Sequence, residues 1–391
     1  MALCGDGLSV DAELVRAAEQ ATEQALDAIE GGTPDLVTVF VCSADPDEAA
    51  AALERAGRVT GARTVVGCSA AGVIGGGRGV ETTSSVSVWV AQLPGAALRS
   101  FHLEVLRTSE SIAVVGMPVQ RPDDAAAMLL VDPYSFPVDA FVEQANDELP
   151  GLMLSGGLAT GLRGAGSTRL LVDGVVHDRG AVGVVLGGSV SSTAIVSQGC
   201  RPVGRAMTVT AAEGNVLLGL AGVPAIDKLE QLVATLSAEE QALATRGLQL
   251  GIAMDEYADE HTRGDFLVRG VVGADPQRRG LVVGDVVEVG RTVQFQVRDA
   301  DTADVDLRTV LRTTYDRDDR ADHRIAGALL FSCTGRGAGL FASADHDVLA
   351  VRDGLHTSGV AGFFAAGEIG PVGGRNHLHG FTASVLAFAT A

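Results

Sequence analysis

The chain has 391 residues, 47% of them hydrophobic, and a net charge of −20. Its length fits two domains, or three, and its composition allows a substantial buried core. The excess of acidic groups argues against nucleic acid or an anionic membrane surface as partner, and Lys228, the only lysine, leaves little room for Schiff-base or phosphate-loop lysine chemistry.

The predicted elements begin with a helix over residues 9–30, in which small and apolar residues recur on one face before a Gly-Gly pair. A buried, β-branched strand follows at 36–41. A helix over 45–55 begins with Asp as N-cap and Pro in the first turn. A second strand at 64–68 runs into the small residues 69–75. The order is therefore strand, cysteine, helix, strand and small-residue loop.

This order recurs along the chain. A strand at 329–333 also ends in cysteine, and its unit ends in Ala-Ala-Gly-Glu-Ile-Gly at 365–370, which matches Ala-Ala-Gly-Val-Ile-Gly at 70–75. A looser copy covers 128–161, and a fourth covers 248–275. Four units, two in each half, indicate an internal duplication. The alternative is that strands of Ala- and Gly-rich proteins often end in small residues without any duplication.

A unit of this length carries a helix between two strands, which is the crossover that parallel pairing requires. Alternating stretches at 80–93, 168–187, 193–211 and 281–298 indicate antiparallel strands. We therefore predict an α/β fold of the mixed α+β kind, with two related domains of mixed sheets, flanking helices and duplicated β-α-β units.

The predicted domain boundary lies between residues 205 and 245. A turn and a proline precede a helix there, and Ser-Ala-Glu-Glu at 237–240 matches a capping box. We place the domains at 30–220 and 221–388.

The cysteine pattern indicates the redox environment of the protein. Their number is odd, their spacings are long and no CxxC occurs, so a disulfide framework or a cysteine zinc site is not expected. We find no signal peptide and no apolar run long enough to span a membrane. We expect a cytoplasmic protein, and the Ala, Gly and Arg bias suggests a bacterial source.

The densest cluster of chemically useful residues lies at 367–384. Four glycines and a proline at 367–374 form a tight loop in which side chains cannot block a ligand, and five side chains add an anion, a cation, an amide and two imidazoles. This set suits a zwitterion, because Glu can bind an amino group and Arg a carboxylate. The side chains are Glu368, Arg375, Asn376, His377 and His379.

A second group lies upstream, where a strand ends at Cys333 and Arg336 follows among glycines. Ligands of α/β sheets collect at the carboxyl ends of parallel strands. If the strands before 333 and 365 are parallel neighbours, Cys333, Arg336 and Glu368 should converge.

These residues also carry a resemblance. Phe-Ser-Cys-Thr-Gly-Arg-Gly at 331–337 and the segment 362–384, which includes Gly-Glu-Ile-Gly-Pro-Val-Gly-Gly-Arg-Asn-His-Leu-His-Gly-Phe, resemble the C-terminal FIST domain, named for F-box and intracellular signal transduction proteins. Gly-Cys-Ser-Ala-Ala-Gly-Val-Ile-Gly at 67–75 and Ser-Gly-Gly-Leu-Ala-Thr-Gly at 155–161 resemble its N-terminal partner domain. The resemblance spans roughly 30–385.

The resemblance implies a sensory protein that binds a small ligand, amino-acid-like or carboxylate, without turnover, and that acts with a signalling partner. It implies no catalytic residues, and we expect no cofactor. The expected ligand-binding residues are Cys333, Arg336, Glu368, Arg375, Asn376, His377 and His379.

Other readings stay open. Some relatives carry an F-box, so a protein-interaction adaptor is one alternative. A hydrolase or transferase is another, with Cys333 as nucleophile, His379 as base and Glu368 as orienting acid. The C-terminal cluster could also be a structural loop with solvated charges. A nucleotide fold is disfavoured because GxGxxG is absent, and a metal site because His377-x-His379 lacks further ligands at a suitable spacing.

Overall fold

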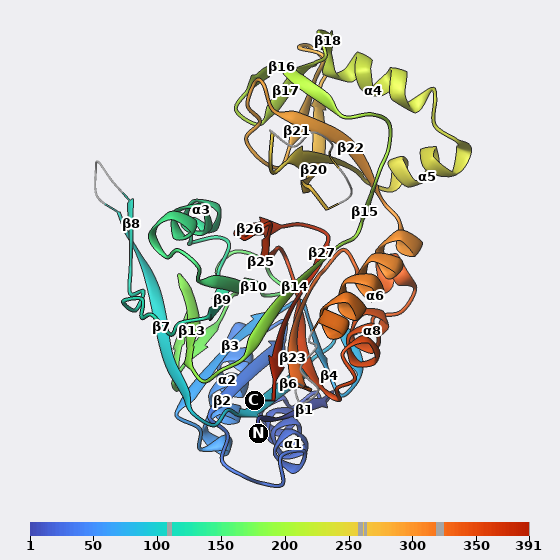
Figure 1. Ribbon diagram of the computed structural model, residues 1–391. Coiled ribbons are helices and arrows are strands. Elements are labelled where there is room, and N and C mark those ends of the chain that lie inside the picture. The colour runs from blue at the N-terminus through green and yellow to red at the C-terminus, as the bar shows by residue number, and fades with distance from the viewer. Residues whose placement is uncertain (108–111, 257–260, 262–263, 318–323, 391) are drawn as a thin grey trace. The chain divides into compact units, whose positions relative to one another are not determined.

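A computed structural model describes residues 1–107, 112–256, 261, 264–317 and 324–390 (Figure 1). Helices and strands alternate along these residues, which confirms the mixed α/β class. The chain forms two compact units. The first is Met1–Ser197, Leu307–Leu378 and Thr382–Ala391, and the second is Gln198–Asp306 with His379–Phe381. The predicted domains 30–220 and 221–388 stay a prediction, because the compact units are interleaved in sequence.

Three sheets form the described part of the first unit. Sheet 1 has, in spatial order, β1 (Leu3–Ser9), β6 (Ser85–Gln92), β2 (Leu36–Cys42), β3 (Thr64–Ala70), β11 (Leu170–Val172) and β12 (Val175–His177). Sheet 2 has β8 (Ile112–Val115), β7 (Ala96–Arg107), β13 (Ala181–Gly188), β9 (Ala126–Val131), β10 (Met153–Leu158), β25 (Glu368–Val372) and β26 (Arg375–His379). Sheet 3 has β14 (Ser192–Gln198), β27 (Thr382–Ala389), β23 (Ile325–Cys333), β24 (Gly359–Ala365), β4 (Gly72–Gly75) and β5 (Arg78–Glu81).

Helices cover one side of each sheet. Sheet 1 packs against α1 (Leu14–Asp27) and α2 (Pro46–Thr60), sheet 2 against α3 (Val138–Glu148), and sheet 3 against α6 (Ala300–Arg317) and α8 (His346–Gly354). The short α7 (Gly337–Phe341) precedes α8. As the sequence predicts, Asp45 caps α2, its Oδ1 accepting from the backbone N–H of Asp47 at 2.8 Å, and Pro46 is the first helical residue.

The three sheets follow one plan. Each has a parallel pair joined by a helix: β2 and β3, β9 and β10, and β23 and β24. A returning strand lies antiparallel to the first member of each pair, namely β6, β13 or β27. We call the three segments repeat 1 (β1–β6), repeat 2 (β7–β13) and repeat 3 (β14–β27, with the second unit inserted after β14).

The hairpin of each repeat pairs with a strand of another repeat. The hairpin β4–β5 of repeat 1 pairs with β24 of repeat 3, and β25–β26 of repeat 3 pairs with β10 of repeat 2. The hairpin β11–β12 of repeat 2 pairs with β3 of repeat 1. The exchange is therefore cyclic, and it ties the three sheets together.

The hairpin turns have a clear sequence cause. Gly76-Gly77 and Gly373-Gly374 all have positive φ angles, and Asp173-Gly174 take the same conformation in repeat 2. Two successive residues with positive φ form the type I′ turn that suits a tight hairpin. Gly373 and Gly374, which we predicted to leave space for a ligand, therefore make a turn.

One apolar core fills the space shared by the three sheets. It contains residues of all three repeats, such as Phe40, Met128 and Phe331. Phe363 contacts Phe40 and Phe331 at ring-centroid distances of 5.1 and 5.6 Å. Trp89, the only tryptophan, is fully buried in this core. We call it the central core.

The second unit is a closed β-barrel. Its strands follow the order β22 (Thr292–Arg298), β16 (Met207–Glu213), β17 (Val216–Leu220), β21 (Gly280–Val283), β20 (Phe266–Asp275) and β19 (Leu248–Ala253), and β19 pairs again with β22. The short strands β15 (Cys200–Pro202) and β18 (Val223–Pro224) pair with β22 and β17. Helices α4 (Ala225–Val233) and α5 (Ala238–Arg246) complete it, and Ser237 and Glu240 form the predicted capping box.

The barrel corrects one prediction. Residues 248–275 were expected to form a fourth β-α-β unit, but β19 and β20 are an antiparallel pair, and no helix lies between them in the described residues. The apolar run ending in small residues misled us, because it also suits neighbouring barrel strands. The repeats are therefore the three described above, and they are not arranged two to each half.

Candidate functional site

Glu368 is a buried acid at the first position of β25, and its side chain has no exposed surface. Its Oε2 accepts hydrogen bonds from the backbone N–H of Thr382 at 3.1 Å and from the Thr382 hydroxyl at 2.8 Å. Its Oε1 is buried without a hydrogen bond of ordinary geometry among the described residues. Burial raises the pKa of Glu368 to about 8, although Thr382, the Cys333 thiol and the Arg336 charge each act to lower it.

Arg336 lies close enough to act electrostatically on Glu368 and Cys333. Its guanidinium is fully buried and makes a two-point ion pair with Asp347, Nε to Oδ2 at 2.7 Å and Nη2 to Oδ1 at 2.9 Å. Ser332 donates to the same carboxylate at 2.6 Å. The adjacent guanidinium holds the pKa of Asp347 far below its usual range against the effect of burial. The remaining nitrogen of Arg336, Nη1, is buried and has no partner among the described residues.

The loop after β23 is shaped by its glycines. The backbone N–H of Arg336 donates to the Cys333 carbonyl at 2.8 Å, which turns the chain back on itself. The Glu81 carboxylate, from the exchanged hairpin, accepts from the N–H of Ala338 at 2.9 Å. A Cβ at Gly337 would lie 2.4 Å from Glu81 Oε1, so a larger residue there would displace the Glu81 carboxylate.

The structure brings together the three residues expected to converge, Cys333, Arg336 and Glu368. The parallel pairing of β23 with β24, in register from Gly327–Gly359 to Cys333–Ala365, is the cause. The sequence did not point to Asp347, Ser332 and Thr382. Asp347 pairs with Arg336, Ser332 donates to Asp347, and Thr382 donates to Glu368. The signal for Asp347 was weak, since an acid in the first turn of a helix usually serves as helix-terminal charge.

The other expected residues have different surroundings. Arg375 is exposed, and its Nη2 lies 3.7 Å from Asp147. Asn376 is buried, and its amide accepts from the N–H of Leu154 in β10 and donates to the carbonyl of Leu152 just before that strand. His377 is half-buried on β26. His379 is buried and belongs with Phe381 to the second unit.

Glu368 has two counterparts in the exchanged hairpins. In each hairpin one residue forms the ladder pair nearest the carboxyl end of the receiving strand: Glu368 opposite Gly157, Val73 opposite Phe363 and Leu170 opposite Cys68. We call these three the sister positions. All are fully buried, and Val73 and Leu170 belong to the central core. Repeat 3 therefore carries an acid where the other two repeats carry apolar side chains.

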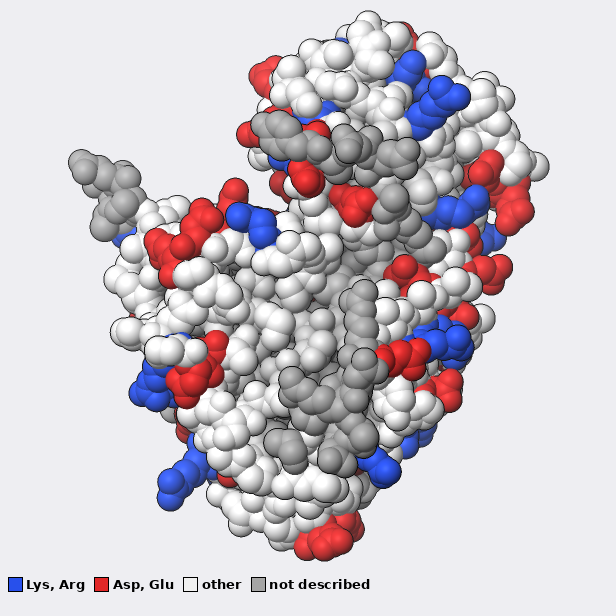
Figure 2. Space-filling model, in the orientation of Figure 1, with Lys and Arg blue, Asp and Glu red and all other residues white. Residues whose placement is uncertain are grey.

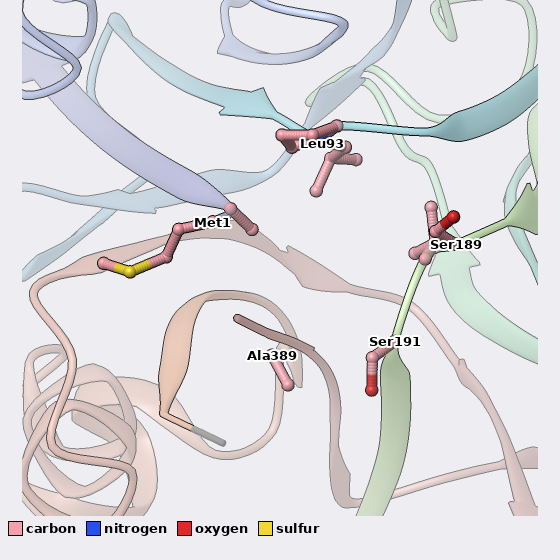
Figure 3. Close-up of a pocket in the computed structure, with 8 residues that line it drawn as sticks. Met1, Leu93, Ser189, Ser191 and Ala389 are labelled. Atoms are coloured by element: carbon pink, nitrogen blue, oxygen red, sulfur yellow. The ribbon is translucent and has the colours of Figure 1, made fainter. Parts of the chain in front are cut away.

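A small hollow of about 30 Å³ also opens on the first unit. Figure 3 shows it between Met1, Leu93, Ser189, Ser191 and Ala389, at the ends of strands of all three repeats. Its lining is small or apolar and has no titratable side chain. It does not offer the chemistry found around Glu368.

The distribution of charged side chains on the surface agrees with the net charge of −20. On the face shown in Figure 2, acidic and basic side chains are interspersed, and no broad basic area is visible among the described residues. No helix in the described ranges is long and apolar enough to cross a membrane.

Comparison with known proteins places this arrangement in a family. The model of the FIST N domain matches residues 35–223, and that of the FIST C domain matches residues 225–371. The chain belongs to the FIST family. FIST domains are sensory domains of signal transduction, and the family predicted from the motifs is thereby confirmed.

Two relatives cover almost the full length of this FIST protein. The uncharacterised protein Rv0628c of Mycobacterium tuberculosis is 42% identical over 388 residues, which are 98% of this chain and 99% of the relative. The uncharacterised protein Mb0898c of Mycobacterium bovis is 42% identical over 385 residues, 98% of each chain. Chains similar to this one over almost their full length therefore occur in mycobacteria.

Proposed function

We propose that this FIST protein senses a small zwitterion, such as an amino acid, or a related carboxylate, and that it binds this ligand without turnover. The binding residues are Glu368, Arg336 and Cys333. The observation that carries the proposal is the buried acid at Glu368, where both sister positions are apolar.

A buried carboxyl group costs stability unless it is fully hydrogen-bonded. Val73 and Leu170 demonstrate that an apolar side chain fits this place in the fold. An acid that the fold does not need is a candidate for function, and strongly shifted pKa values gather at functional sites.

The unused atoms suggest the ligand. Glu368 Oε1 offers an acceptor for an amino group, and Arg336 Nη1 offers a donor for a carboxylate. Asp347 already neutralises the Arg336 charge, so Nη1 acts as a hydrogen-bond donor more than as an ion-pair partner. Arg375, Asn376, His377 and His379 stay predicted ligand residues.

Binding of an amine should release a proton. With a pKa of about 8, Glu368 is mostly protonated at pH 7, and an ammonium group beside it would favour the carboxylate. Each binding event at pH 7 should therefore release up to about 0.9 protons from this group.

The test is a thermal-shift screen of the purified protein with the twenty amino acids and small carboxylates. A ligand at ~100 times its Kd adds about 2.7 kcal/mol of apparent stability. Calorimetry of any hit in buffers of different ionisation enthalpy then counts the released protons. Glu368→Gln should abolish the shift and the proton release, and Glu54→Gln, on the exposed side of α2, should leave both unchanged.

Two outcomes would contradict the proposal: no compound shifts the melt, or the hits survive Glu368→Gln. Cys333→Ser separates sensing from catalysis. A sensor should keep most of its affinity, whereas an enzyme with a Cys333 nucleophile should lose turnover of the hit compound.

A further inference from the structure

In the barrel of the second unit, the paired strands β19 and β22 form a wall whose outer side is buried. The barrel interior holds the apolar side chains of β19 and β22, such as Leu250, Phe295 and Val297. Because side chains alternate along a strand, Gln249, Gln296 and Arg298 lie on the outer side. Gln249 and Gln296 face each other in the ladder and are only 4% and 3% exposed.

Two pieces of chain from the same unit cross this wall, and we call them the strap: residues 198–199 and 379–381. The Gln198 amide donates to the carbonyl of Phe266 on β20 at 3.0 Å, and the N–H of Gly199 donates to the Phe381 carbonyl at 3.1 Å. The Phe381 ring lies 5.1 Å from the Arg298 guanidinium on β22. Since β19 separates β20 from β22, the strap spans the wall.

The amides under the strap are unusual for a packed surface. Gln249 Nε2 makes one long hydrogen bond to the Gly247 carbonyl at 3.3 Å, and its Oε1 is buried without a partner among the described residues. Gln296 folds over Gly251, where a Cβ would lie 2.4 Å from its Nε2. A buried amide oxygen without a donor is costly, and apolar side chains would pack in its place without that cost.

The strap is strained where it meets Arg298. Phe381 has a φ of +62°, in the left-handed region that bulky side chains rarely occupy. Such strain persists only where the surroundings enforce it, and it favours a second arrangement of the segment.

We infer that this wall is a second ligand site, separate from the site at Glu368, for a small molecule that carries an amide or amine N–H beside a carboxylate. The N–H fills the vacant acceptor at Gln249 Oε1, and the carboxylate contacts the Arg298 guanidinium, which Phe381 supports from below. The strap shifts to admit it. The inference goes beyond the proposed function, because Gln249, Gln296 and Arg298 take no part there.

The test compares probes that differ in the N–H. L-asparagine and L-glutamine supply both groups, whereas succinate and glutarate supply carboxylates alone. We expect one of the amides at 10 mM to raise the melting temperature by at least about 2 °C and the diacids to give less than half of that shift. Gln249→Met and Gln296→Met keep the side-chain length without the amide, and each should abolish the shift. Gln277→Met, in an exposed turn, is the matched control.

The outcomes separate the two sites. A shift that survives Glu368→Gln but not Gln249→Met supports the second site. A shift lost with Glu368→Gln and kept in both Met variants places the ligand at Glu368 and overturns this inference, while the proposed function stands. If neither amide shifts the wild-type melt, this inference is overturned whatever the screen at Glu368 gives.

Discussion

Repeats 1 and 3 have the same plan but opposite chemistry at the end of their parallel pairs. In repeat 1 the exchanged hairpin brings Val73 into the central core, and the second residue of α2, Asp47, is in solvent. In repeat 3 the same places hold Glu368 and Asp347, both buried, with Arg336 beside them. The fold is therefore compatible with an apolar side chain at this hairpin position, where repeat 3 has a buried acid beside a buried ion pair.

The largest effect should come from breaking the buried ion pair. Asp347→Ala leaves Arg336 charged and buried, and we expect a loss of about 3–5 kcal/mol in the free energy of unfolding. Asp47→Ala, at the second residue of the matching helix, removes a side chain that is 95% exposed and should change stability by less than about 1 kcal/mol. Trp89 fluorescence during urea unfolding follows the central core, which lies on the opposite faces of the sheets from α2 and α8. Equal losses in the two variants would refute the burial of Asp347.

The next effect is a pH dependence. The folded pKa of Glu368 is about 8 and the ordinary value is 4.5, so the folded state holds a proton that the unfolded state releases in this window. Stability from this group is complete below pH 4.5 and declines up to pH 8. Between pH 4.5 and 7, wild type should lose about 3 kcal/mol relative to Glu368→Gln, which does not titrate. Parallel stability profiles for the two proteins would show that Glu368 titrates normally.

The smallest effect concerns the hairpin turns. Arg375 and Arg78 each follow a Gly-Gly turn, and both are exposed. Arg375→Ala and Arg78→Ala should each change the free energy of unfolding by less than about 0.5 kcal/mol in the same urea assay. Any change in ligand affinity that is confined to Arg375→Ala then reports a direct contact. A large stability loss in either variant would contradict the exposed positions.

Much of repeats 1 and 3 was predictable, because their signals are local. The strand before Cys333, the cap at Asp45 and the shared Ala-Ala-Gly pattern follow from residue spacing. The convergence of Cys333, Arg336 and Glu368 followed from a rule about parallel strands, and the pairing of β23 with β24 bears it out.

What the sequence did not reveal depends on long-range partners. The residues near Glu368 contain no signal that the β25–β26 hairpin pairs with β10 of another repeat, because a hairpin can pair with any open sheet edge. Arg336 looked available to a ligand because its partner, Asp347, reads as an ordinary acid at the start of a helix. The glycines at 373–374 looked like space for a ligand, although they also match a type I′ turn.

The cyclic exchange of hairpins has a consequence for how such a chain could arise. A single repeat has no partner strand for its own hairpin and no hairpin for its own sheet, so alone it leaves two edges open. Three separate copies would satisfy one another only as a closed ring, in the manner of a domain-swapped trimer. The first unit has the strand arrangement of such a trimer within one polypeptide chain. In a chain formed by fusion of three copies, each copy can change independently, so an acid can enter one hairpin while the other two keep the ring closed.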